Sequence, residues 1–245
     1  MATSLTRSVR VLGVRVDCVD MAGTMARIGE LVERAGPCAQ LATVNPEFVM
    51  HARADPDFAA ILERCDLCLA DGIGVVWAAR RSGCRLRERV TGSDLLPRLA
   101  AECARSGWRP FFLGAMPGVA EEAARRLAAA HPGFQVAGTY SGRPDPSGDA
   151  EALARIEAAR PDLLLVAYGH PRQERWIARN RDRLPVPVAI GVGGSFDFAA
   201  GRVHRAPAWM RRIHLEWFFR LLLQPWRARR MAVLPLFTVR VLTSR

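Results

Sequence analysis

Short apolar runs alternate with longer stretches of helical periodicity along most of the chain. The runs predict seven strands, at residues 10–16, 40–43, 67–70, 110–114, 134–138, 163–168 and 186–192. The stretches between them predict seven helices, at residues 21–35, 46–54, 72–80, 93–106, 117–130, 149–160 and 171–181. Continuous apolar strands that alternate with helices are typical of a largely parallel α/β sheet covered by helices on both faces.

Several of the predicted helices begin with a recognisable start signal. A proline follows Asn45, Met116 and His170 at the first helical position, and Ser93 is expected to cap its helix. The polar loop at residues 141–148 could divide the fold into two halves. Sheets of this kind bind ligands at the carboxyl ends of their strands, so polar residues that follow the strands are candidates for function.

The pattern changes after Gly201. Residues 202–245 contain ten arginines and one acidic residue, Glu216, which gives this segment +9 of the chain's formal charge of +11. Within it, residues 208–224 predict an amphipathic helix that ends at Pro225. We therefore expect an α/β body at residues 1–201 and a C-terminal basic amphipathic helical appendage at residues 202–245. Arginine mixed with large apolar side chains suits an anionic membrane surface or a nucleic acid.

Composition limits the other possibilities. No window reaches 18 apolar residues without a charge, and residues 1–10 lack an apolar signal-peptide core, so we expect a cytosolic chain. The six cysteines lack the spacing of a disulfide framework and are expected to be buried, Cys65 and Cys68 included. The five histidines are scattered, and Asp55-Pro-Asp57 is better placed to cap a helix than to hold a metal. We expect no metal.

Two predicted strands end in residues that suit sugar chemistry. Thr43 and Asn45 share a face at their strand end, where either can bond a sugar, although Asn45 is equally suited to cap the next helix. Asp71 directly follows the next strand, where it is placed either as a general base on a hydroxyl or as a helix cap. Gly72-x-Gly74 is too short for a dinucleotide fingerprint, which argues against a nicotinamide enzyme.

The other strand ends offer groups for an anion. Arg89 either neutralises a phosphate or belongs to a solvated loop, and Gly114 precedes a helix N-terminus that presents N–H groups. The segments at residues 168–174 and 191–197 place polar side chains and closely approachable glycine backbone at two further strand ends. Their candidate ligand-binding residues are Gly169, His170, Arg172, Gln173, Gly193 and Gly194.

Six motifs, taken in this order, resemble one enzyme family. They are T-V-N-P-E, A-D-G-I-G, R-V-T-G-S-D, F-L-G-A, G-H-P-R-Q-E and G-V-G-G-S-F-D. The ordered set closely resembles the WecG/TagA/CpsF glycosyltransferases over nearly the whole chain. The resemblance implies a Rossmann-like fold and transfer of a sugar, typically N-acetylmannosamine, from a UDP-sugar to a polyprenyl-diphosphate-linked acceptor sugar. The products of the family are linkage units for wall teichoic acid and other surface polysaccharides.

The resemblance also implies roles for individual residues. It assigns the general base to Asp71. It assigns substrate binding or catalysis to Thr43, Asn45, Arg89 and Gln173. The family's appendage supplies catalytic arginines, whose counterparts here are Arg220, Arg227 and Arg230. The resemblance further implies inversion at the anomeric carbon, no metal or cofactor, a location on the inner face of the cell membrane, and self-association.

Two alternatives stay open. One is a related transferase that takes UDP-glucose or another UDP-hexose for exopolysaccharide synthesis. The other is a non-enzymatic nucleic-acid-binding protein, which the tail permits but the nearly neutral body argues against. An epimerase is expected to have a catalytic Tyr-x-x-x-Lys, and this chain has no lysine.

Overall fold

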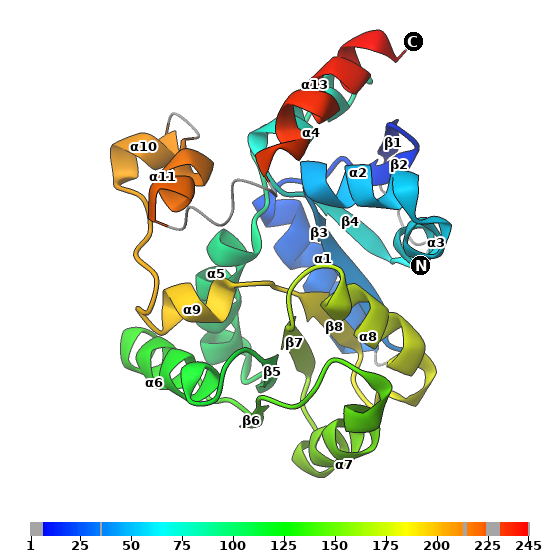
Figure 1. Cartoon of the computed structure of the whole chain (residues 1–245). Coiled ribbons are helices and arrows are strands. Elements are labelled where there is room, and N and C mark those ends of the chain that lie inside the picture. The colour runs from blue at the N-terminus through cyan, green and yellow to red at the C-terminus, as the bar shows by residue number, and fades with distance from the viewer. Residues whose placement is uncertain (1–6, 35, 213–214, 224–230, 245) are drawn as a thin grey trace.

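The chain is built around one parallel β-sheet (Figure 1). The computed structural model describes residues 7–34, 36–212, 215–223 and 231–244. The six strands lie in the order β4-β3-β8-β7-β5-β6, and every neighbouring pair is parallel. They are β3 (Ala39–Val44), β4 (Leu67–Ala70), β5 (Pro110–Gly114), β6 (Gly138–Tyr140), β7 (Leu163–Ala167) and β8 (Val188–Gly191). The predicted parallel α/β sheet is therefore confirmed.

Helices cover both faces because successive strand side chains point to opposite sides. In β7, Leu163 and Leu165 join one apolar cluster, whereas Leu164 and Val166 join another. The first face packs against α1 (Met21–Arg34), α5 (Gly92–Ser106), α6 (Val119–Ala130) and α9 (Ser195–Ala199). The other face packs against α2 (Pro46–Ala54), α3 (Pro56–Arg64), α4 (Ile73–Arg81), α7 (Asp149–Ala159), α8 (Arg172–Asn180) and α13 (Val233–Thr243).

The N-terminal strand prediction was wrong in detail. Residues 10–16 do not form one strand; β1 (Ser8–Val11) and β2 (Val14–Asp17) form an antiparallel hairpin. The chain reverses at Leu12 and Gly13, which have φ angles of 49° and 93°. Glycine adopts such positive angles without steric cost, and it supplies the turn that a strand pattern alone does not reveal.

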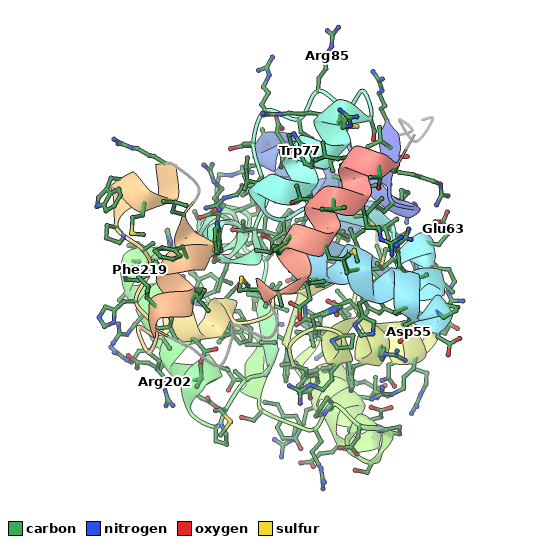
Figure 2. All side chains as sticks on the ribbon, turned by 45° about the horizontal axis from the view of Figure 1, so that its top comes forward. Asp55, Glu63, Trp77, Arg85, Arg202 and Phe219 are labelled. Carbon is green, nitrogen blue, oxygen red and sulfur yellow. A yellow bond between two sulfur atoms is a disulfide. The ribbon has the colours of Figure 1, made fainter. Side chains whose placement is uncertain are left out.

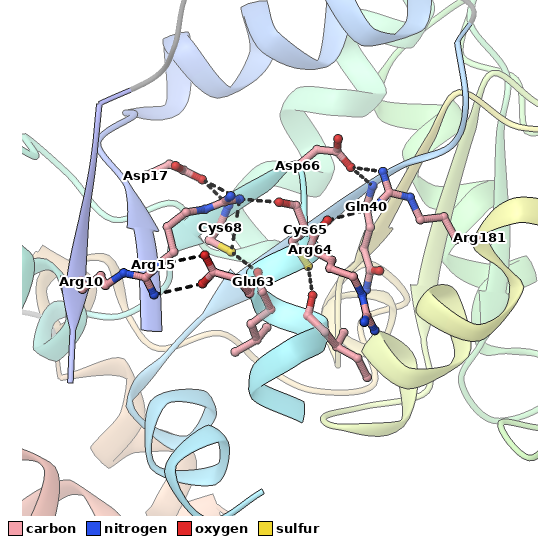
Figure 3. Close-up of polar contacts among 12 residues, drawn as sticks. Arg10, Arg15, Asp17, Gln40, Glu63, Arg64, Cys65, Asp66, Cys68 and Arg181 are labelled. Carbon is pink, nitrogen blue, oxygen red and sulfur yellow. Dashed lines mark hydrogen bonds and ion pairs between the residues drawn. The ribbon is translucent and has the colours of Figure 1, made fainter. Parts of the chain in front are cut away.

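Polar contacts fasten this hairpin to the body (Figure 3). The guanidinium of Arg10 donates two hydrogen bonds to the Glu63 carboxylate, at 3.0 and 2.8 Å. The Asp17 carboxylate accepts a 2.7 Å bond from the Cys68 amide of β4. The second bond is buried and therefore contributes more than the exposed pair. The hairpin thus covers the β4 edge of the sheet.

The cysteine prediction holds for four of the six thiols. Cys38, Cys65, Cys68 and Cys103 are free and buried, as expected. Cys18 and Cys84 were expected to be unpaired, but they form a disulfide between residues 66 positions apart. No local pattern indicates this pair, because only the tertiary fold brings the end of β2 beside the loop after α4.

The C-terminal segment departs from the prediction of one helix at residues 208–224. It forms α10 (Ala208–Arg212) and α11 (Glu216–Leu223) with a non-helical Leu215 between them. The α13 helix follows, and its Phe237 and Val241 are buried among residues of α2 and α4. None of the helices within the described residues has the length and apolar character needed to span a membrane. The boundary at residue 201 and the appendage as a unit stay predictions.

Candidate active site

A pocket of about 500 Å³ lies at the carboxyl ends of four neighbouring strands, β4, β3, β8 and β7. This is where a parallel sheet places its ligand site, because the loops that follow these strands meet there. The C-terminal segment contributes Glu216, Trp217 and Phe237 to the wall. Ten of the predicted site residues line the pocket: Thr43, Asn45, Asp71, Arg89, Gly169, His170, Arg172, Gln173, Gly193 and Gly194.

The end of β3 supplies two of these groups. The Thr43 hydroxyl is buried and donates to the Gly191 carbonyl of β8 at 3.4 Å. The side-chain oxygen of Asn45 accepts a 3.1 Å bond from the Phe48 amide and caps α2. The capping role of Asn45 is therefore confirmed, and its side chain still borders the pocket.

Asp71 lies directly after β4, and its backbone N–H donates to the Val44 carbonyl at 2.8 Å. The N-cap of the following helix is Gly72, with a φ angle of 98°, so the capping alternative for Asp71 was wrong. The half-buried Asp71 borders the pocket instead. This position leaves the acid–base interpretation of its carboxylate standing.

Arg89 reaches the pocket because its loop returns along the end of β4. The Val90 amide donates to the Ala70 carbonyl at 2.8 Å, which fixes the neighbouring arginine at the strand end. The Arg89 guanidinium lies 3.0 Å from the Glu216 carboxylate of α11. The solvated-loop alternative was therefore wrong, since only 16% of this side chain is exposed.

A second arginine completes a small ionic network on this wall. Arg205 bonds Glu216 at 3.1 Å and Asp94 at 2.8 Å. Burial raises the pKa of Asp94, but the hydrogen bond and charge of Arg205 outweigh burial and hold this pKa below its usual value. Two cations and two carboxylates thus alternate where α5 meets the C-terminal segment. The helix α5 is capped by Thr91 rather than by the expected Ser93.

Gln173 ties the ends of β7 and β8 together. Its side-chain oxygen accepts from the backbone amides of Gly169 and Gly193, at 3.1 and 3.0 Å. Its side-chain nitrogen donates to the carboxylate of Glu174 at 2.7 Å. Gly169, Gln173 and Gly193 all line the pocket, so Gln173 fixes the backbone of two strand-end loops in its wall.

Four predicted site residues are not placed in the pocket. Gly114 ends β5, where an added Cβ would lie 2.8 Å from the Ala167 backbone carbon, so close strand packing explains its glycine. The backbone of Arg220 belongs to α11, but its side chain lies outside the described part of the chain. Arg227 and Arg230 also lie outside the described residues.

The sequence patterns missed several groups in the pocket wall and directly behind it. Glu216 lines the pocket, and Arg205, Glu174 and His51 contact the lining residues Glu216, Gln173 and His170. Glu216 offered one signal, because it is the single acidic residue in an arginine-rich segment. Within the described residues, no group of three or more His, Cys, Asp and Glu is placed to hold a metal. Asp55 caps α3 as predicted, accepting from the Phe58 amide at 3.0 Å.

Comparison with known proteins identifies the family and its class of reaction. The profile of the Glycosyl transferase WecG/TagA/CpsF family matches residues 9–245. The chain belongs to this family. It is similar to an N-acetylglucosaminyldiphosphoundecaprenol N-acetyl-beta-D-mannosaminyltransferase of Bacillus subtilis (strain 168), with 39% identity over 205 residues, 83% of this chain and 79% of that protein.

A second relative with the same name, from Staphylococcus aureus (strain MRSA252), is 30% identical over 239 residues, which is 97% of this chain and 93% of that protein. The chain is therefore a glycosyltransferase, as predicted. This result removes the non-enzymatic nucleic-acid-binding alternative. The pocket at the strand ends is accordingly the candidate active site.

Proposed function

We propose that this glycosyltransferase moves N-acetylmannosamine from a UDP-sugar to the N-acetylglucosamine of an undecaprenyl-diphosphate-linked acceptor, in the synthesis of a cell-surface polysaccharide. The observation that supports this best is a single pocket bordered by a carboxylate, Asp71, and a guanidinium, Arg89. A base and a phosphate-binding cation are the two groups that transfer from a nucleotide-sugar requires. The names of the relatives supply the sugar and the acceptor.

The proposed reaction is one displacement. Asp71 accepts the proton of the acceptor hydroxyl while that oxygen attacks the anomeric carbon of the donor. The bond from this carbon to the β-phosphate oxygen breaks, and UDP leaves with the electron pair. Attack opposite the leaving group inverts the anomeric configuration. Without a metal, arginine N–H groups stabilise the charge that grows on the β-phosphate.

Arg89 is the candidate for this stabilisation among the described residues. A guanidinium has five N–H donors, so its bond to Glu216 does not exhaust its capacity. Arg172 borders the same pocket, close to the backbone of Gly169. Arg220, Arg227 and Arg230 are proposed to add further positive charge from the C-terminal segment. Thr43 and Asn45 are proposed to contact the sugar.

The acceptor's lipid requires the enzyme to work at a membrane surface, and we propose that the C-terminal helices provide the contact. Their exposed apolar side chains include Trp209, Trp217, Phe218, Leu222, Leu236, Val239 and Leu242. Large apolar groups beside arginines favour the headgroup region of an anionic bilayer. In Figure 2, Phe219 lies on α11. Trp77 of α4 and Arg85 lie on a separate part of the surface.

The test is a donor screen against a short-chain N-acetylglucosamine-diphosphate-prenyl acceptor, with and without EDTA. We expect transfer from UDP-N-acetylmannosamine, at an unchanged rate in EDTA, with the inverted linkage in the product. Preference for UDP-glucose would instead support the exopolysaccharide alternative. No transfer from any UDP-sugar would reject the proposal.

A further inference from the structure

The end of α4 and the loop after it display a group of arginines on the α/β body, although the body as a whole is nearly neutral. Residues 77–87 contain no acidic residue and four arginines, all exposed: Arg80, Arg81, Arg85 and Arg87. The side chains of Cys84 and Leu86 point inward and are 2% and 4% exposed. Because they alternate with Arg85 and Arg87, these two arginines are held at the surface.

The loop at residues 80–87, here called the basic loop, is ordered by contacts of its own. The Arg80 guanidinium donates to the backbone carbonyls of Leu86 and Arg87, at 2.7 and 3.0 Å. The disulfide between Cys18 and Cys84 ties the loop to the end of β2. A ligand that binds this loop therefore does not have to order it first, which reduces the entropic cost of binding.

Exposed apolar side chains lie beside the basic loop. Gly74 of α4 packs on Phe237 of α13, since an added Cβ would lie 3.5 Å from that ring. Trp77 and Arg81 follow Gly74 by three and seven positions, so they lie on the same side of α4. Trp77 is 37% exposed. Figures 1 and 2 both show α13 beside α4, and the exposed face of α13 presents Leu236, Val239 and Leu242.

This combined surface adjoins the candidate active site. Ile73 and Gly74, at the start of α4, line the pocket, and so do Leu234 and Phe237 of α13. The chain that follows the basic loop returns to the pocket at Arg89. The nine residues of α4 span only about 14 Å. The arginines at the far end of α4 are therefore a short distance from the pocket.

We propose that the basic loop and Trp77, together with the exposed face of α13, bind an anionic lipid bilayer and turn the pocket toward it. The inference assigns part of the membrane contact to the α/β body, and it rests on the proposed function where it concerns the lipid-linked acceptor. Guanidiniums bind lipid phosphates through paired N–H groups, and an indole favours the headgroup level. A nucleic acid also attracts arginines, but it offers no partner to the aliphatic face of α13.

A charge-removing variant tests this surface. Replacing Arg81, Arg85 and Arg87 together with glutamine removes the outward charges and keeps Arg80, which closes the loop. Each basic residue strengthens binding to an anionic bilayer about fivefold. Binding of the full chain to phosphatidylglycerol-containing vesicles should therefore weaken at least tenfold in flotation assays. The same urea unfolding midpoint as the wild type would show that the variant is folded.

A matched control removes the same charge elsewhere. It replaces exposed arginines on α5, α6 and the turn after α8 with glutamine: Arg98, Arg125 and Arg183. Its vesicle binding should stay within about threefold of the wild type, because charges farther from the bilayer than about 10 Å are screened. Equal weakening of the two triple variants would overturn the proposal, since binding would then follow net charge rather than this surface.

Salt and lipid composition test the nature of the contact. At about 1 M salt the screening length falls to about 3 Å, so the wild type and the basic-loop variant should bind the anionic vesicles equally. They should also bind equally to phosphatidylcholine vesicles, which have no net charge. A difference that persists in either condition would reject the electrostatic role. Unchanged vesicle binding with lost affinity for a short RNA would show instead that the surface serves a nucleic acid.

Activity separates this surface from catalysis. The basic-loop variant should transfer sugar to a soluble short-chain acceptor at the wild-type rate, because the three arginines lie outside the pocket lining. With the acceptor embedded in phosphatidylglycerol-containing vesicles, its rate should fall at least tenfold. Equal loss with both acceptors would overturn the proposal. No transfer to the short-chain acceptor by the wild type would reject the proposed function, while flotation would still decide whether this surface binds lipid.

Discussion

Asp71 is the residue on which the proposed chemistry depends most. Asp71→Asn keeps the shape of the side chain but removes its ability to accept a proton. Base catalysis typically contributes about 10²–10⁴-fold, so turnover should fall at least ~100-fold. The affinity for UDP should change little, because the base acts on the acceptor. Steady-state rates and UDP titration measure the two effects separately. Near-normal turnover would remove Asp71 from the mechanism.

Gln173 has a structural role that a sequence motif does not reveal. Gln173→Ala leaves the amides of Gly169 and Gly193 without their buried acceptor, at a cost of about 1–3 kcal/mol for each lost bond. We expect the free energy of unfolding to fall by about 2–4 kcal/mol in urea titration. Gln135→Ala is the matched control, because Gln135 is exposed, and it should change stability by less than about 0.5 kcal/mol. Equal effects of the two substitutions would show that Gln173 does not hold the ends of β7 and β8 together.

Three elements were predicted at their observed bounds, namely β4 and β5 from apolar runs alone and α2 from a local start signal. Asn45-Pro46 located α2 at its observed bounds, because a cap and a first-turn proline act within the segment itself. The strand prediction at residues 134–138 was wrong, since Phe134 and Val136 pack against the core from a non-strand segment and β6 begins only at Gly138. Residues 141–148 do not separate two sheets, because β5 and β7, on either side of this loop, pair with each other.

Contacts between elements could not be predicted from local patterns. The strand-end rule identified ten pocket residues, since topology alone places strand ends together. The pairs Arg89–Glu216 and His51–His170 join positions 127 and 119 residues apart. The periodicity of one helix does not indicate which distant side chain will contact it. These two contacts could therefore be identified only in the folded structure.

The break between α10 and α11 determines where α11 begins and which residues it contacts. One helix was expected at residues 208–224, but Leu215 is non-helical and α11 begins at Glu216, whose carboxylate meets Arg89 and Arg205. Glu216→Gln should remove most of this attraction, worth about 1.5–3 kcal/mol for bonds to charged groups. Hydrogen exchange in α11 should then accelerate roughly 10–100-fold.

A matched control separates this effect from general loss of charge. Glu151→Gln removes an exposed carboxylate that pairs with Arg155 on α7, far from α11 in the chain. Exposed pairs contribute little, so exchange in α11 should stay at the wild-type rate. If Glu216→Gln also leaves α11 unchanged, the ionic network does not hold this helix to the body.

At the scale of the whole molecule, α13 has two faces with different tasks. It lies across the front of the molecule in Figure 2, and its buried face packs Phe237 and Val241 into the core. A chain shortened to residues 1–201 would therefore lose part of the core as well as the basic segment. Point substitutions on each face separate the two tasks where truncation cannot.

Replacing Leu236, Val239 and Leu242 together with serine removes the exposed apolar face, since these side chains are 47%, 56% and 53% exposed. Stability should change little, because exposed positions seldom contribute more than about 0.5 kcal/mol each. Binding to phosphatidylglycerol-containing vesicles should fall at least tenfold, since each buried CH₂ contributes about 0.8 kcal/mol. Phe237→Ala is the converse control and should cost about 3–5 kcal/mol of stability through the cavity it leaves. Wild-type vesicle binding by the triple variant, in flotation assays, would show that another surface meets the membrane.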